Sequence, residues 1–246
     1  MSDSVKEKLI VALDVETARE AREFFAMLGE HAGMFKIGSQ LFTSAGPELA
    51  REIVGAGGRI FLDLKFHDIP NTVAAACREA ARLGVSIFNV HAAGGGEMMR
   101  RAVEALNETA ARESLARPRL IAVTVLTSAD ANLLNEIGVQ SSLREQVVAL
   151  ARLAERCGIN GVVASPHEIA PIRAAVERKD FIIVTPGVRP ARAAHDDQKR
   201  VMTPAEAIRA GADYIVVGRA ILNAPDPARA AQEILAEMRK AEGIGE

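Results

Sequence analysis

Short apolar runs alternate with longer amphipathic stretches along almost the whole chain. The runs are rich in Val, Ile, Leu and Phe, and such runs are typical of strands buried on both faces. Helix-start signals lie between them, as at Thr17 with Glu20 and at Thr203-Pro204 with Glu206. The pattern predicts eight strands: LIVALD (9–14), MFKIGSQ (34–40), RIFLDLKF (59–66), SIFNVH (86–91), LIAVTVL (120–126), GVVAS (161–165), FIIVTPG (181–187) and YIVVGRA (214–220).

Strict alternation of strand and helix predicts parallel pairing through right-handed crossovers. Eight such units in 246 residues match the size of a (β/α)8 TIM barrel, an α/β fold that we expect to form a single domain over residues 1–246. The rival is an open doubly wound sheet. It would need a Gly-x-Gly-x-x-Gly turn after the first strand, where this chain reads Leu13-Asp14-Val15-Glu16-Thr17. The sequence therefore favours the barrel.

Composition and charge are those of an ordinary globular chain, with 49% hydrophobic and 25% charged residues. The net charge of −2 gives no reason to expect nucleic acid or an anionic membrane as a partner. The N-terminal apolar run is too short for a signal peptide or a membrane span. Cys77 and Cys157 lie in predicted helices and make no disulfide framework, so we expect buried reduced thiols in a cytoplasmic protein.

Polar residues concentrate at the predicted strand ends, where the active sites of (β/α)8 barrels lie. Asp14 or Lys36 alone could equally be a solvated loop charge, and His91 is better interpreted as a structural histidine than as a base. The polar strand-end residues are Asp14, Lys36, Asp63, Lys65, Asn89, His91, Thr124, Thr127, Ser165, Thr185 and Arg219.

The most informative segment is RIFLDLKFHDIPNT (59–72), in which Asp63, Lys65 and Asp68 fall at the end of an apolar strand. Asp63 and Lys65 share one strand face because they are two residues apart, and charges there are costly to desolvate unless they pair. Lys36 belongs to the neighbouring strand, so Lys36, Asp63, Lys65 and Asp68 would alternate in sign and keep one another ionised. This arrangement predicts a catalytic charge network. Clustered carboxylates can also bind a metal, but an ammonium among them competes for that position, so no metal is expected.

A second signal is Gly218-Arg219 at the end of the eighth predicted strand, where phosphate sites of these barrels form. Gly218 lets a backbone N–H approach an anion, and Arg219 offers a planar fork to phosphate oxygens. The polar stretch 187–202 has the length of a lid or binding loop. Within it, Gln198 could close over the same phosphate, and Arg189 is the best candidate among the loop's arginines for a ligand contact.

Eight segments of the chain resemble the orotidine 5′-phosphate decarboxylase family in sequence and order. They are LIVALD, FKIG, DLKFHDIPNT, NVHA, VTVLTS, VTPGVRP, DQKRVMTP and YIVVGRAI, and the resemblance runs from about residue 8 to residue 238. DLKFHDIPNT is the most specific of these segments. The resemblance implies loss of CO2 from orotidine 5′-monophosphate (OMP) to give UMP, in de novo pyrimidine synthesis, without a cofactor or a metal.

The resemblance also implies a role for each matching residue. Lys65 would protonate C6 as CO2 leaves, and Asp63 would lie against the departing carboxylate. Asp14 and Lys36 match positions that hold the ribose hydroxyls, with Lys36 also supporting the charge network. Thr127 matches a contact to the pyrimidine, and the phosphate-end positions are matched by Arg189, Gln198, Gly218 and Arg219.

Asp68 and Thr72 match residues that reach into the neighbouring subunit's site, which implies a homodimer with two shared active sites. One alternative lies in the same barrel group, in the metal-dependent 3-keto-6-phosphogluconate decarboxylases and hexulose-phosphate synthases. These share D-x-K-x-x-D but carry a Glu at the end of strand two, where this chain has Lys36, and an ammonium opposes a divalent cation. The other alternative, a phosphate-binding barrel without catalysis, would not need the complete charge network.

Overall fold

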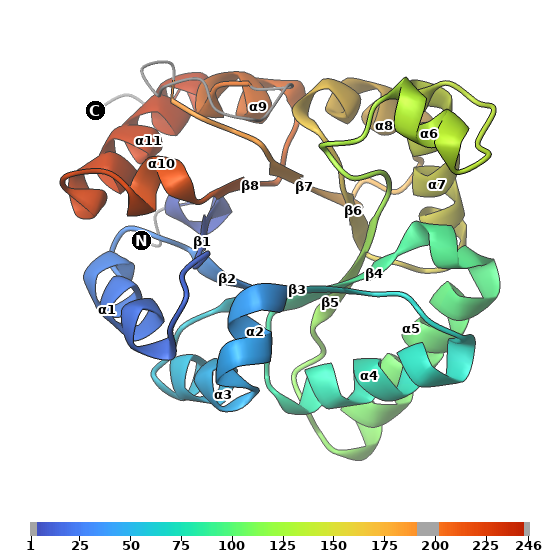
Figure 1. The fold of residues 1–246 in the computed structure, drawn as a ribbon, viewed down its shortest axis with the longest axis horizontal. Coiled ribbons are helices and arrows are strands. Elements are labelled where there is room, and N and C mark those ends of the chain that lie inside the picture. The colour runs from blue at the N-terminus through green and yellow to red at the C-terminus, as the bar shows by residue number, and fades with distance from the viewer. Residues whose placement is uncertain (1–3, 191–201, 244–246) are drawn as a thin grey trace.

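The computed structural model describes residues 4–190 and 202–243, which form a closed barrel of eight parallel strands surrounded by helices (Figure 1). The strands follow one another around the barrel in chain order, and β1 pairs with β8 to close it. The predicted (β/α)8 fold is confirmed. The strands are β1 (Leu9–Ala12), β2 (Met34–Gly38), β3 (Ile60–Phe66), β4 (Ile87–His91), β5 (Arg119–Val123), β6 (Gly161–Val163), β7 (Ile182–Pro186) and β8 (Tyr214–Val217).

The helices begin where the sequence places caps. Thr17 accepts a hydrogen bond from the N–H of Glu20, whose carboxylate accepts one from the N–H of Thr17, and Thr203 with Glu206 repeats this capping box. The α-helices are α1 (Ala18–Leu28), α2 (Ser39–Ala45), α3 (Glu48–Gly55), α4 (Pro70–Arg82), α5 (Gly95–Arg112), α6 (Ala131–Glu136), α7 (Leu143–Arg156), α8 (Ile169–Ala175), α9 (Pro204–Ala210), α10 (Arg219–Leu222) and α11 (Pro227–Glu242). Short 3-10 turns are η1 (Lys6–Lys8), η2 (Ala92–Gly94) and η3 (Pro166–Glu168).

Alternate side chains of each strand point into the barrel or outward to the helices. The larger apolar core lies between strands and helices, as the two-sided hydrophobicity of the strands requires. At the N-terminal end of the barrel, Arg119 donates a hydrogen bond to the Tyr214 hydroxyl (2.9 Å). The barrel interior is filled by Ile10, Ala12, Met34, Phe61, Ile87, Ile121, Ile182, Val184, Tyr214 and Val216.

Several predicted strands were too long at their C-terminal ends. β1 stops at Ala12, so Asp14 lies beyond it, and β2 stops at Gly38, so Gln40 belongs to helix α2 rather than to the strand face of Lys36. β8 stops at Val217, and Arg219 opens α10. The physical reason is that the local sequence does not mark where pairing stops, because the partner strand sets where the ladder ends.

Candidate active site

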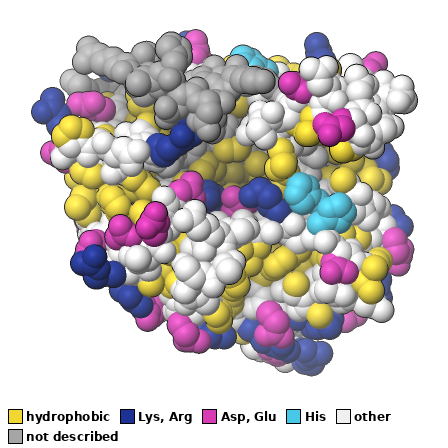
Figure 2. Space-filling model, viewed as in Figure 1, with side chains coloured by type: hydrophobic (Ala, Val, Ile, Leu, Met, Phe, Trp, Pro, Cys, Tyr) yellow, Lys and Arg dark blue, Asp and Glu magenta, His cyan; other side chains and the backbone are white. Residues whose placement is uncertain are grey.

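A cleft opens at the C-terminal ends of the strands. Figure 2 shows charged side chains of both signs gathered beside an apolar hollow in the middle of one face of the molecule. The cleft has two adjoining parts, which share Lys36, Pro186 and Val216. One part holds Asp63 and Lys65 against an apolar wall, and the other is rimmed by the loops after β7 and β8. A single elongated ligand can therefore contact both parts.

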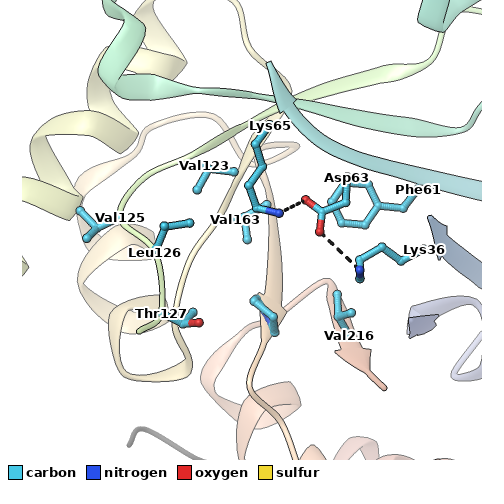
Figure 3. Close-up of a pocket in the computed structure, with 11 residues that line it drawn as sticks. Lys36, Phe61, Asp63, Lys65, Val123, Val125, Leu126, Thr127, Val163 and Val216 are labelled. Atoms are coloured by element: carbon cyan, nitrogen blue, oxygen red, sulfur yellow. Dashed lines mark hydrogen bonds and ion pairs between the residues drawn. The ribbon is translucent and has the colours of Figure 1, made fainter. Parts of the chain in front are cut away.

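Asp14, Lys36, Asp63 and Lys65 form a chain of alternating charge that runs from the segment after β1 across β2 to β3. Lys36 Nζ lies 2.8 Å from Asp14 Oδ1 and 3.6 Å from Asp63 Oδ2. Lys65 Nζ lies 2.7 Å from Asp63 Oδ1, so the two ammonium groups approach different oxygens of one carboxylate (Figure 3). The side chains of Lys36 and Asp63 are only 11% and 13% exposed, so each charge offsets the desolvation of the other. The alternation that the sequence predicts is present from Lys36 to Lys65.

The protonation of this network follows from its geometry. Burial alone would raise the pKa of Asp63, but the charges of Lys36 and Lys65, with hydrogen bonds from Lys65 and Asn89, outweigh it and hold that pKa below its usual value. Asp63 is therefore ionised at neutral pH. Beside the network, burial lowers the pKa of His91, and the neighbouring His67 and Lys65 lower it further. The rings of His67 and His91 lie 5.5 Å apart between centroids.

Asn89 on β4 is the site residue to which sequence reasoning gave no role. Its Oδ1 accepts a hydrogen bond from the backbone N–H of Lys65 (2.7 Å), and its Nδ2 donates one to Asp63 Oδ1 (2.7 Å). Lys65 itself has a left-handed backbone with φ of 53°. The sequence feature that could have indicated a role is a polar amide within the apolar strand IFNVH. It is not charged, so a search for charged residues does not find it.

The wall that faces the charges is apolar, and Thr127, which follows the end of β5, lines the same part of the cleft. The sequence did not reveal the apolar residues of this wall, because a valine at the end of a strand has the same local sequence pattern as a valine in the core. Figure 3 shows most of these side chains around Lys65 and Asp63. The wall consists of Phe61, Val123, Val125, Leu126, Val163, Pro186 and Val216.

The second part of the cleft brings together the predicted anion-binding residues Arg189, Gly218 and Arg219. Gly218 packs closely, because a Cβ there would lie 3.3 Å from Ala12 Cβ, a tight contact, and 3.4 Å from Asp14 Oδ2, an ordinary one. Asp14 lines this same part, so the charge chain reaches the part of the cleft that holds the two arginines.

Two of the described residues that the sequence predicts for the site do not line the cleft of their own chain. Asp68 is exposed after β3, with its carboxylate accepting a hydrogen bond from the N–H of Ile69 (2.6 Å), and Thr72 is exposed on the first turn of α4. Neither is among the described residues that line the cleft. Gln198 lies outside the described residues. Three other polar residues at strand ends are buried and do not line the described cleft: Thr124, Ser165 and Thr185.

Within residues 4–190 and 202–243, no three His, Cys, Asp or Glu side chains are grouped as a metal site would require. The ammonium of Lys36 lies between Asp14 and Asp63, at the position from which a cation could bridge those two carboxylates. None of the described helices has the length and apolarity needed to cross a membrane.

A closed (β/α)8 barrel with paired lysines and aspartates in a cleft at its strand ends has the architecture of an enzyme that acts on a small molecule. The family model described as "Orotidine 5'-phosphate decarboxylase / HUMPS family" matches residues 7–234. The chain belongs to this family.

Relatives with high identity extend over nearly the full chain. A protein of Geobacter sulfurreducens named orotidine 5'-phosphate decarboxylase is 56% identical over 96% of this chain and 98% of its own length. One of Geotalea daltonii with the same name is 54% identical over the same shares. The crystal structure of orotidine 5'-phosphate decarboxylase from Lactobacillus acidophilus is similar with a TM-score of 0.82 and 38% identity, covering 94% of this chain and 98% of that one. The resemblance inferred from the sequence motifs is confirmed.

Proposed function

We propose that this chain is a carboxy-lyase that converts OMP to UMP and CO2, in de novo pyrimidine synthesis, without a cofactor or a metal. Relatives at 51–56% identity that carry the name orotidine 5'-phosphate decarboxylase support the substrate. The observation that carries the mechanism is that two ammonium groups, those of Lys36 and Lys65, pair with the single buried carboxylate of Asp63.

The same observation argues against the metal-dependent members of this barrel group. Their chemistry needs a carboxylate at the end of strand two as an oxygen ligand for a divalent cation. Here Lys36 occupies that place and is 2.8 Å from Asp14. A cation entering between Asp14 and Asp63 would have to displace a charge of its own sign.

The chemistry requires charge stabilisation rather than an electron sink. When the bond between C6 and the carboxylate breaks, the electron pair stays on C6 in the plane of the ring, where no π system delocalises it. A fixed ammonium at that position stabilises the charge as it develops. Lys65 then donates its proton to C6, CO2 departs, and Lys65 regains a proton from solvent. Lys65 is thus the proposed proton donor, with Asp63 holding its ammonium in place.

Asp63 and the apolar wall act on the departing group. We place the substrate carboxylate beside Asp63, where repulsion between two carboxylates is relieved as neutral CO2 forms. The wall that includes Val123 and Val163 suits CO2 better than it suits a carboxylate, because it offers no hydrogen bond to a charge. Both effects favour the transition state over the bound substrate.

The rest of the cleft is proposed to bind the nucleotide. Asp14 and Lys36 would hold the ribose hydroxyls, since both lie where the two parts of the cleft meet. The phosphate would bind at Arg189, Gly218 and Arg219, with Gln198 closing over it, as a guanidinium fork and an accessible backbone favour phosphate oxygens. Thr127 would contact the pyrimidine. Binding energy from this distant phosphate can then order the site for chemistry.

Asp68 and Thr72 are proposed to complete the site of a second copy in a homodimer. Both are exposed and lie at the same corner, where β3 gives way to α4. Ile69 between them is 67% exposed, so a partner could bury it. A partner barrel facing this corner would cover Ile69 and receive both polar side chains.

The two cysteines indicate the cellular compartment in which the protein works. Cys77 and Cys157 are buried and free, and burial raises the pKa of the Cys77 thiol to about 12. Unpaired thiols are the usual state in a reducing cytoplasm. We therefore propose a cytoplasmic enzyme. The net charge of −2 supports the further proposal that it acts on a small molecule and has no nucleic-acid or membrane partner.

The test is an absorbance assay of OMP consumption by the purified protein, run with excess EDTA and again with added Mg²⁺. We expect OMP to be consumed at the same rate in both. Turnover of 3-keto-6-phosphogluconate that depends on Mg²⁺, with OMP left intact, would assign the chain to the metal-dependent group instead.

A further inference from the structure

The end of β3 departs from a regular strand beside β4. Leu62 pairs with Phe88 and Phe66 pairs with Val90, so three residues of β3 stand opposite the single residue Asn89. A regular ladder would match residues one to one, and an insertion of this kind is a bulge that changes where side chains point. The three residues in the bulge are 63, 64 and 65, and they include both charged groups of the proposed reaction centre.

The bulge holds Lys65 in a backbone conformation that lysine rarely adopts. Its φ is 53°, in the left-handed region that disfavours residues with a Cβ. Such conformations persist only where the surroundings fix them, and they concentrate at functional sites. Because residues 63, 64 and 65 all stand opposite Asn89, Asp63 and Lys65 lie beside the same residue of β4. The Lys65 ammonium folds back onto the Asp63 carboxylate at 2.7 Å.

The side chain of Asn89 supplies the missing hydrogen bonds of this bulge. It replaces a carbonyl of the ladder by accepting from the N–H of Lys65, and it donates to Asp63 Oδ1, both at 2.7 Å. An N–H needs an acceptor and an ionised carboxylate needs a donor, so the two partners fix which end of the amide faces which. Asn89 is 0% exposed and is not among the described residues lining the cleft, so it reaches a ligand only through its two partners.

We infer that Asn89 is a positioning residue for decarboxylation: its buried amide holds the bulge that aims the Lys65 ammonium and fixes Asp63 as its ionised partner. The inference rests on the proposed function, in which Lys65 donates the proton to C6. No side chain with only an acceptor or only a donor can do both tasks. An apolar residue of equal size would leave the Lys65 N–H and one Asp63 oxygen without these partners.

The first test compares Asn89→Leu with Asn160→Leu in the OMP assay. Asn160 is a matched control, because its Oδ1 likewise accepts from a strand N–H, that of Leu120 (3.0 Å), but at the N-terminal end of the barrel. We expect Asn89→Leu to lower kcat by about 100-fold with KM changed less than about threefold, as expected when a reacting group is misplaced but binding is kept. Asn160→Leu should keep kcat within about twofold of wild type. Equal kcat in the two variants would overturn the inference.

Asn89→Asp provides a second test, read only at pH values at which circular dichroism shows the variant to be folded. The new carboxyl group keeps an acceptor for the Lys65 N–H, and it can donate to Asp63 only while it is protonated. Its kcat relative to wild type should therefore fall as the pH rises, by up to about tenfold for each pH unit above the pKa of the new group. A ratio that does not change with pH would contradict the role, whether or not Asn89→Leu folds.

A crystal structure of Asn89→Asp at high pH separates this inference from the proposed function. We expect the backbone of Lys65 to leave the left-handed region and its ammonium to move away from Asp63. An unchanged Lys65 together with wild-type kcat would refute the role of Asn89 alone. Full activity in Lys65→Ala would instead refute the proposed proton donor, whatever the geometry of the bulge.

Discussion

At the scale of single residues, the site depends on how one carboxylate is surrounded. Asp63 Oδ1 accepts from Lys65 and Asn89, and Oδ2 faces Lys36. These contacts lower the pKa of Asp63 in the folded protein despite its burial. The folded state therefore binds that proton more weakly than the unfolded chain, in which the pKa is about 3.9. The resulting stability is present above the unfolded value and is lost as the pH falls through the folded one.

The first prediction concerns Lys36→Met, which removes one of the two cations facing Asp63. At pH 7 the variant should lose about 2 kcal/mol of unfolding free energy, because a buried carboxylate is left with fewer partners. The loss should shrink as the pH is lowered toward about 4, since Asp63 can then take up a proton in the variant. Urea unfolding at pH 7 and at about pH 4 measures this loss of unfolding free energy. Arg229→Met, in the exposed Arg229–Glu233 pair, is the control and should cost less than about 0.5 kcal/mol. A loss for Lys36→Met that is the same at both pH values would contradict the coupling.

At the scale of elements, local signals predicted the starts of helices better than the ends of strands. The capping boxes of Thr17 and Thr203, with Pro204 at the first helical position, mark helix starts through hydrogen bonds and backbone angles that the local sequence itself fixes. The predicted end of β2 was wrong, because pairing with β3 stops at Gly38 and no local signal marks that point. The bulge in β3 was beyond prediction, since register depends on β4 and no residue near Lys65 signals a left-handed backbone.

In the site, too, the features fixed by the local sequence were predictable and those fixed by contacts between strands were not. Asp63 and Lys65 were predictable because two charges on one face of an apolar strand are costly unless they pair. Their contact with Lys36 followed from the order of strands in the barrel. Asn89 acts through contacts between strands, and apolar wall residues such as Val163 differ from core residues only in facing the cleft. Those properties belong to the closed barrel rather than to any segment of the sequence.

At the scale of the whole molecule, barrel closure brings β8 beside β1, so that Arg219 and Asp14 line one part of the cleft although the sequence separates them widely. The exposed corner with Asp68, Ile69 and Thr72 follows the C-terminal end of β3, and none of the three is among the described residues that line the cleft. One barrel therefore presents a cleft and, outside it, a separate set of polar groups. This arrangement is the one that the proposed homodimer requires, in which each copy completes the site of the other.

Mixing two inactive variants tests the proposed sharing. Lys65→Ala and Asp68→Ala subunits, unfolded together and refolded at equal amounts, should recover about one quarter of wild-type activity, because half of the dimers are mixed and each mixed dimer has one intact site. Lys65→Ala mixed with Lys36→Ala should recover none, since both defects lie in a subunit's own cleft. No recovery in the first mixture, with mixed dimers demonstrated by mass spectrometry, would count against shared sites.

The most direct test of the central claim is the rate of OMP decarboxylation by Lys65→Ala and Lys65→Arg, measured alongside UMP binding by calorimetry. Both variants should bind UMP within about tenfold of wild type. Both should lose at least about 10⁴-fold in kcat, Lys65→Arg included, because a guanidinium keeps the charge but does not give up its proton. A rate close to wild type in either variant would show that Lys65 is not the proton donor.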